Sequence, residues 1–242
     1  MSIHVRSLRE APAWRRFWDW AFFGGSFTAS LLFGVAVGNA MIGVPLDEFG
    51  NFTGSVLDQL GPYPLLVGAM TVSLFAMHGG LFLYLKTEGD FQQRLREWMW
   101  RSWGLFMVTF MLTTVATVAF IPRATENFRS FPWAIVVVVG TILAVANVPR
   151  CLYRDMPGLA FLSSGGVIAG LVALFGLALY PNLVTASGDP ARSVTIFNAA
   201  SSPKTLGIML IIAAVGMPFV LTYSGVIYWT FRGKVKLGEH SY

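Results

Sequence analysis

The chain has 242 residues, of which 55% are apolar and only 12% are charged. So much apolar sequence with so few charges excludes an ordinary soluble domain and indicates a membrane protein. The 17 Lys and Arg outnumber the 12 Asp and Glu, so the net charge is +5. Whether this charge indicates a nucleic-acid partner depends on where the basic residues lie along the chain.

Six long apolar runs follow one another along the chain. The hydrocarbon core of a bilayer is about 30 Å thick and a helix rises roughly 1.5 Å per residue, so about 20 apolar residues cross it. Four runs reach that length, and the third and fourth extend into flanks that are rich in Trp and Phe. We predict an all-α integral membrane protein with six transmembrane helices, at residues 17–42, 64–85, 105–121, 133–148, 159–180 and 206–231.

The connections divide the chain into five parts. An arm of residues 1–16 precedes the first two helices at 17–85, a loop at 86–104 leads to the last four helices at 105–231, and a tail occupies 232–242. Because each loop among the last four helices is short enough for antiparallel neighbours, we expect an up-and-down four-helix bundle there and a helix pair before it. The longest outer loop, at 181–205, should be ordered by its prolines and by packing against a partner.

Lys and Arg alternate from one connection to the next. When the connections are assigned to alternate sides, 13 of the 17 basic residues fall on one side and 4 on the other. The positive-inside rule then places both termini in the cytoplasm. Since no basic stripe remains after this partition, the charge reports topology and nucleic acid is excluded as a partner.

Small residues mark faces on which the helices should touch, because membrane helices associate through close packing and hydrogen bonds. Gly34 and Gly38 form such a pair in the first helix, and Gly166 and Gly170 in the fifth. In the third helix, Thr109, Thr113 and Thr117 recur at every fourth residue, which places them on one helix face.

His78 is the one ionisable side chain in the middle of a predicted span, and such a residue raises a functional hypothesis. A haem ligand usually needs a second axial ligand, and no other His lies in a span; a proton relay needs neighbouring carboxyl groups, which the spans lack. A neutral core histidine needs a single partner, such as Asn147 or a Ser or Thr. We favour this structural role, and assign the same role to Asn39 and Asn147.

The sequence contains no phosphate-binding Gly-Lys-Ser/Thr loop, no CxxC and no HExxH motif. No cluster of ligands has a spacing that suits a metal. We therefore assign no catalytic, cofactor-binding or metal-binding residue to this chain.

Several stretches together resemble subunit II of the cytochrome bd-type quinol oxidases, from about residue 14 to residue 242. They are residues 14–20 (WRRFWDW), 33–39 (FGVAVGN), 43–47 (GVPLD), 77–80 (MHGG), 85–89 (LKTEG), 180–184 (YPNLV), 195–206 (TIFNAASSPKTL), 216–218 (GMP), 228–235 (YWTFRGKV) and 239–242 (EHSY). The outer-loop stretch and the tail are the most specific of these.

The resemblance implies a function that composition does not give. Complexes of this family, in the bacterial cytoplasmic (inner) membrane, oxidise quinol and reduce O2 to water. Their haems and the quinol-oxidising loop belong to subunit I. Subunit II is implied to be haem-free, to support assembly, to shield the haem region and to contact lipid and the quinone pool. A structural quinone or lipid within it is compatible with the family, and the position of His78 is not a haem ligand there.

The chain departs from the family in its number of helices. Members usually have eight transmembrane helices, whereas this sequence predicts six, and its start aligns with the loop before the third. We therefore expect an N-terminally short form that lacks the first two helices. A small-molecule transporter and a cytochrome that binds haem by itself remain as alternatives. A transporter tends to place charges or broken helices near the midplane, and a cytochrome calls for a second histidine.

Overall fold

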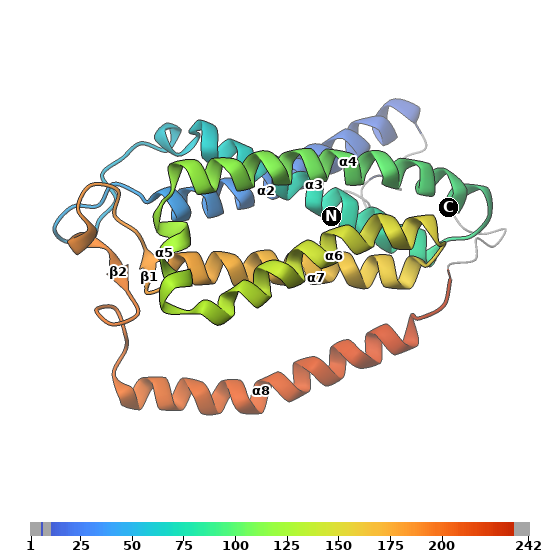
Figure 1. Ribbon diagram of the computed structural model, residues 1–242. Coiled ribbons are helices and arrows are strands. Elements are labelled where there is room, and N and C mark those ends of the chain that lie inside the picture. Colours follow the sequence, from blue (N-terminus) through green and yellow to red (C-terminus); the bar gives the residue numbers. More distant parts are fainter. Residues whose placement is uncertain (1–5, 7–10, 235–242) are drawn as a thin grey trace.

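The computed structural model describes residue 6 and residues 11–234 (Figure 1). Within these residues, six helices are long and apolar enough to cross a membrane, as the sequence predicted. They are α2 (Pro12–Ile42), α3 (Pro62–Lys86), α4 (Gly89–Phe120), α6 (Ile135–Tyr153), α7 (Pro157–Leu179) and α8 (Pro203–Thr230). Most of the predicted arm and tail lies outside the described residues.

The helix starts follow from local chemistry. Proline begins α2, α3, α7 and α8, since it has no N–H to leave unpaired in the first turn and its φ already suits a helix. Ser202 also caps α8, because its hydroxyl accepts a hydrogen bond from the Thr205 N–H at 3.3 Å. Four of the six long helices therefore begin at a signal that is visible in the sequence.

The predicted loop at residues 86–104 is largely helical, which corrects the sequence-based boundary. Here α4 begins at Gly89 and continues without a break into the apolar run. These first turns are amphipathic: Met99 and Ser102 are buried whereas Arg94 and Glu97 are exposed. Hydropathy marks only the part of a helix that meets lipid, so it missed the polar turns that precede it.

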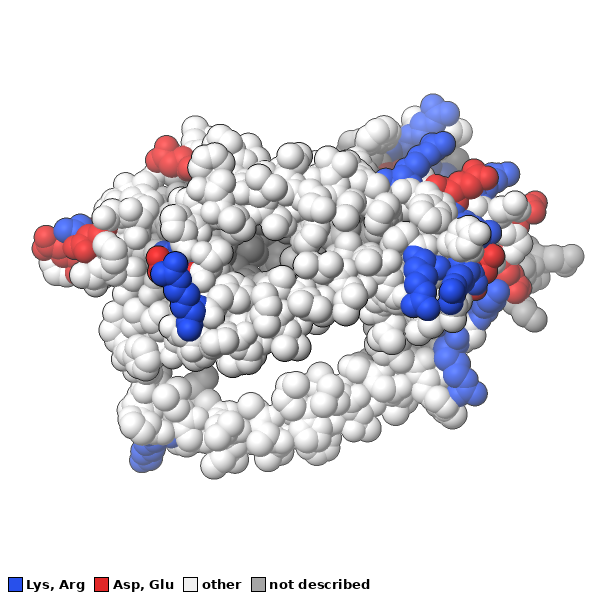
Figure 2. All heavy atoms as spheres, viewed as in Figure 1, with Lys and Arg blue, Asp and Glu red and all other residues white. Residues whose placement is uncertain are grey.

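The charges separate to the two ends of the molecule. Figure 2 shows most Lys and Arg gathered at one end and a middle zone free of charged residues. We call the end that holds most Lys and Arg the arginine-rich end. It contains the C-termini of α3, α6 and α8 and the N-termini of α2, α4 and α7. The opposite end holds the remaining basic residues of the described chain: Arg123, Arg129, Arg192 and Lys204.

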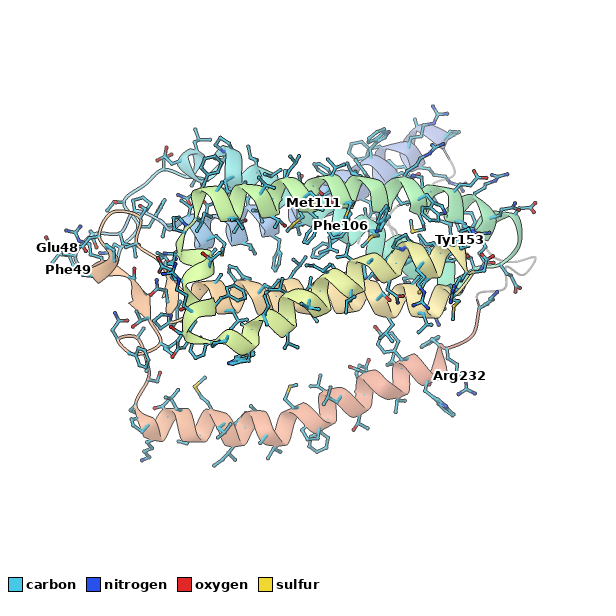
Figure 3. All side chains as sticks on the ribbon, in the orientation of Figure 1. Glu48, Phe49, Phe106, Met111, Tyr153 and Arg232 are labelled. Carbon is cyan, nitrogen blue, oxygen red and sulfur yellow. The ribbon has the colours of Figure 1, made fainter. Side chains whose placement is uncertain are left out.

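The core lies where α3, α4, α6 and α7 meet. Its cluster of buried side chains includes Leu74 and Met77 of α3, Phe106 of α4, Val148 of α6 and Val167 of α7. Figure 3 labels Phe106, which is fully buried, and Met111 on the same helix, which is 52% exposed. One face of α4 therefore packs on the bundle while the other is free to meet lipid.

Close contact between α2 and α3 depends on glycine, as the small-residue pair predicted. A Cβ atom built on Gly38 would lie 2.6 Å from Pro64 Cα, and one on Gly34 would lie 2.6 Å from Gly68 Cα. Both distances are below any real contact between carbon atoms, so the two backbones approach because side chains are absent. This is the close packing that membrane helices use in place of the hydrophobic effect.

The threonines of α4 share one contact face, as predicted, and the helix that this face meets is α3. The hydroxyl groups of Thr109 and Ser73 are 2.8 Å apart, and so are those of Thr117 and Tyr63. Thr113 lies between them and is buried. Hydrogen bonds of this kind join helices in an apolar medium.

The last helix does not join the others, so the expected four-helix bundle of the last four spans is wrong. No residue of α8 is buried, and an open gap separates α8 from the bundle in Figure 2. The bundle of the described chain consists of α2, α3, α4, α6 and α7 instead. In lipid no hydrophobic effect drives helices together, so they associate through close packing and hydrogen bonds. The glycines of α8 make no such contact, since a Cβ added at Gly207, Gly216 or Gly225 would have no neighbour within 4 Å.

Both ends of α8 are nevertheless attached to the rest of the molecule. At the arginine-rich end, Lys86 donates to the carbonyl of Phe231, and Lys234 pairs with Glu88 at 4.0 Å. At the opposite end α8 follows the long connection that contains β1 (Asn182–Val184), η3 (Pro190–Arg192) and β2 (Val194–Thr195). The helix is therefore held by its ends.

The long connection is ordered by the loop between α2 and α3. The strands β1 and β2 pair antiparallel, and Val44 exchanges backbone hydrogen bonds with Thr185 and Ser187 at 2.8 and 3.0 Å. Arg192 adds an ion pair with Glu48 at 3.6 Å. The remaining elements at this end are η1 (Leu57–Gln59), α5 (Arg123–Ser130) and η2 (Pro132–Ala134). Two of the prolines that were expected to order this connection, Pro190 and Pro203, are the first residues of η3 and α8.

Candidate functional site

His78 joins α3 to α7 inside the membrane-spanning region. Its Nδ1 lies 2.8 Å from the hydroxyl oxygen of Ser164, which is fully buried. That hydroxyl donates its single proton to the carbonyl of Phe161 at 2.8 Å. The Ser164 hydroxyl thus lies between the carbonyl of Phe161 and Nδ1 of His78, and its hydrogen bond with His78 joins α3 to α7.

The ring of His78 is also packed. It stacks on the ring of Phe161, with centroids 4.6 Å apart and planes 23° apart. Phe82 approaches the same Phe161 ring at 5.7 Å, so three aromatic rings fill this part of the α3–α7 contact. The predicted partner, a Ser or Thr, is the one found, whereas the other suggestion, Asn147, lies elsewhere.

Asn39 lies near the end of α2 opposite the arginine-rich end. Its amide donates to the carbonyl of Val35 at 2.9 Å and to that of Gln59 at 2.8 Å. It thereby attaches the loop between α2 and α3 to α2. A groove of about 580 Å³ opens beside it, lined by residues of α2, α3, α4 and both long loops, among them Asp58, Tyr63 and Ser187.

Asn147 joins α6 to α7 and holds an arginine. Its amide donates to the hydroxyl of Ser163 at 2.8 Å, and its carbonyl oxygen accepts from Nη1 of Arg150 at 3.3 Å. Arg150 had not been predicted as a partner of Asn147. The signal was present, because residues three apart on a helix are neighbours, and Asn147 and Arg150 have that spacing.

A polar network at the arginine-rich end ties three helices together. Arg96 of α4 pairs with Asp155, in the turn between α6 and α7, at 3.2 Å. The hydroxyl of Tyr84, in α3, donates to the same carboxylate at 3.1 Å, and Arg96 also donates to the carbonyl of Leu152 at 3.3 Å. Asp155 takes a positive φ of 52° in this turn. Sequence reasoning had no signal for this network, since its members lie far apart in the chain.

The three predicted intramembrane polar residues are thus not brought together. His78, Asn39 and Asn147 each join a different pair of elements by hydrogen bonds. The described residues contain no group of three or more His, Cys, Asp or Glu that could hold a metal ion. The arrangement is chemically suited to fixing helices against one another.

The fold and these contacts can be compared with known proteins. The family described as "Cytochrome bd terminal oxidase subunit II" matches residues 1–231. The chain is 29% identical over 267 residues to "Cytochrome bd-I ubiquinol oxidase subunit 2" of Escherichia coli (strain K12), covering 97% of this chain and 70% of that protein. It is 28% identical over 244 residues to "Cytochrome bd ubiquinol oxidase subunit 2" of Bacillus subtilis (strain 168), covering 99% of this chain and 70% of that one.

A solved structure shares the fold. The bd oxidase from Geobacillus thermodenitrificans superposes with a TM-score of 0.64 at 14% sequence identity. The superposition covers 86% of this chain and 62% of the other, so this chain spans less than two thirds of that structure.

Proposed function

The chain belongs to the cytochrome bd terminal oxidase subunit II family, and from that premise we propose that it is the haem-free membrane subunit of a complex that oxidises quinol and reduces O2 to water. In this proposal the chain packs against a haem-carrying subunit I, supports its assembly and shields its haem region from lipid and water. The family match over residues 1–231 carries the proposal. It is supported by the bundle, in which the polar side chains join helices to one another.

The residues present do not fit a haem pocket of this chain's own. His78 is the single histidine of the described part, so no second histidine ligand is present there, and Phe161 stacks on its ring. A haem needs a flat cavity beside its axial ligand and usually a second ligand. The proposal therefore gives the haems to the partner subunit, and the role of this chain consists of holding, packing and shielding.

The large apolar surfaces support a role beside a partner and lipid. Across the described chain, α8 has no buried residue and α4 keeps Leu112, Val115 and Val118 more than half exposed. Surfaces of this kind are stable only in a bilayer or against another membrane protein. We place the chain in the bacterial cytoplasmic membrane, in contact with lipid and the quinone pool.

A small-molecule transporter gains no support from the fold. Transporters of the common types bind substrate where helices are interrupted near the midplane. Here α6 continues through Pro149, and α8 continues through Pro218. No observation on the described residues favours that alternative.

The proposal is tested by purifying the protein that carries this sequence, through an affinity tag, from its native membranes. We expect a second multi-helix polypeptide to copurify in a fixed ratio, together with haem absorption and quinol-dependent O2 consumption. Recovery of this chain alone from membranes that contain active bd-type oxidase would contradict the proposal.

We also propose that the arginine-rich end faces the cytoplasm, since basic residues are retained on that side. Ser187 lies in the long connection at the opposite end, and Gly233 follows α8 at the arginine-rich end. In sealed right-side-out vesicles, a membrane-impermeant thiol reagent should label the Ser187→Cys variant and should leave Gly233→Cys unlabelled until the vesicles are opened. The native Cys151 is buried and does not compete. Labelling of both variants from outside would disprove this orientation.

A further inference from the structure

We propose that the end of α6 holds an anionic phospholipid, with its phosphate bound by Arg150 and Arg154 and an acyl chain lying along the groove beside them. The inference concerns a site that the subunit role does not use, and it rests on the cytoplasmic orientation of the arginine-rich end proposed above. It is carried by the shape of one groove, by the direction of one guanidinium group and by the lack of an acidic partner for two arginines among the described residues.

The groove runs along the surface of α6 and changes character along its length. It has a volume of about 440 Å³ and is lined by Leu143, Ala144, Ala146, Asn147 and Arg150. Toward the middle of the helix its walls are apolar, and the two alanines leave room beside the helix. Toward the arginine-rich end its walls are an amide and a guanidinium. A ligand that fits has a hydrocarbon part and a polar, negatively charged part.

The side chain of Arg150 turns back along the helix. Arginines near a membrane surface commonly extend toward water. Nη1 of Arg150 instead donates to Asn147, one turn closer to the middle of α6, at 3.3 Å. Asn147 is itself fixed by its bond to Ser163. The guanidinium is therefore held at the polar end of the groove, and four of its five N–H groups have no hydrogen-bond acceptor among the described residues.

Arg154 adds a second positive charge one turn further along. Arg154 directly follows the last residue of α6, Tyr153, so both charges belong to the same end of the helix. Neither arginine forms an ion pair with a described acidic residue. The acid next in sequence, Asp155, is engaged by Arg96 and Tyr84. An anion bound at this end of α6 would supply the acceptors that these guanidinium groups lack.

The depth of the pair identifies the anion as a lipid phosphate. Arg150 lies in the last turn of α6, which ends at Tyr153, so its guanidinium lies near the level of the headgroups. Basic pockets at the cytoplasmic ends of membrane helices bind anionic lipid headgroups. The apolar half of the groove then points into the same leaflet, where the acyl chain of the bound lipid would lie.

The test uses the purified protein in nanodiscs of phosphatidylcholine, with bound phosphatidylglycerol measured by native mass spectrometry. We expect Arg150→Gln to lower the affinity for phosphatidylglycerol about tenfold, which corresponds to the loss of one charged contact. Arg94→Gln is the matched control, because Arg94 is exposed at the same end and its replacement removes the same charge from α4. Equal loss in both variants would show attraction to net charge only and would overturn the site.

A second variant separates a lipid from a free anion. Ala146→Leu keeps both arginines and fills the apolar part of the groove; Ala146 is exposed, so the larger side chain is tolerated by the fold. We expect this change to weaken binding of phosphatidylglycerol several-fold. Unchanged affinity in Ala146→Leu, or displacement of the lipid by millimolar inorganic phosphate, would overturn the assignment to a phospholipid.

Discussion

Replacing Gly38 by Val is expected to separate α2 from α3 and to unfold this half of the bundle at a markedly lower temperature. A Cβ at this position would lie 2.6 Å from the Cα of Pro64, which is backbone and cannot turn aside. One of the two helices has to move away, and the hydrogen bond from Asn39 to the carbonyl of Gln59 then loses its geometry. Overpacking of this kind costs about 1–3 kcal/mol or more.

The control for this variant lies on the same helix. A Cβ atom added to Gly25 would have no neighbouring atom within 4 Å, so Gly25→Val adds the same atoms without a clash. The measurement is the thermal unfolding midpoint of each purified variant in detergent, followed by its recovery as a single species on size exclusion. If Gly38→Val unfolded at the same temperature as Gly25→Val, close packing of α2 on α3 would be wrong.

Replacing His78 by Leu should have the second largest effect. The change removes the hydrogen-bond partner that α3 offers to the buried hydroxyl of Ser164, and it removes the ring that stacks on Phe161. A buried polar group left unsatisfied costs about 1–3 kcal/mol. We expect a lower unfolding midpoint and a smaller yield of assembled complex, measured on protein purified from membranes.

The variant His78→Gln distinguishes a hydrogen bond from a ligand. Gln supplies a donor of similar reach, so it should restore most of the stability that Leu loses, with haem content and oxidase turnover largely preserved. A well-assembled His78→Gln complex without its haem would show that His78 serves the haem directly. Equal damage from Gln and Leu would instead show that the bond to Ser164 is not what His78 contributes.

The six spans were predictable because each depends on its own sequence alone, through its length and its apolarity. The glycine contact at Gly34 and Gly38 was predictable for the same reason, since small residues one turn apart identify a face. The partner of that face, α3, was not named by the sequence.

The arrangement of the helices was less predictable, because it depends on contacts between distant residues. The four-helix bundle expected for the last four spans failed at α8, where an all-round apolar surface says nothing about what covers it. The partner of His78 is Ser164, 86 residues away, and no periodicity identifies which of many Ser and Thr it meets. The polar first turns of α4 were missed because a hydropathy pattern detects only the apolar part of a helix.

The central claim is that this chain is a haem-free subunit of a haem-carrying oxidase. The measurement that tests it most directly is the reduced-minus-oxidised absorption spectrum of the purified complex and of this chain after it has been separated from its partner. The account predicts haem absorption in the complex and in the partner fraction, and none in the fraction that contains this chain. A haem spectrum that remains with this chain, at a stoichiometry near one and lost in His78→Leu, would contradict it.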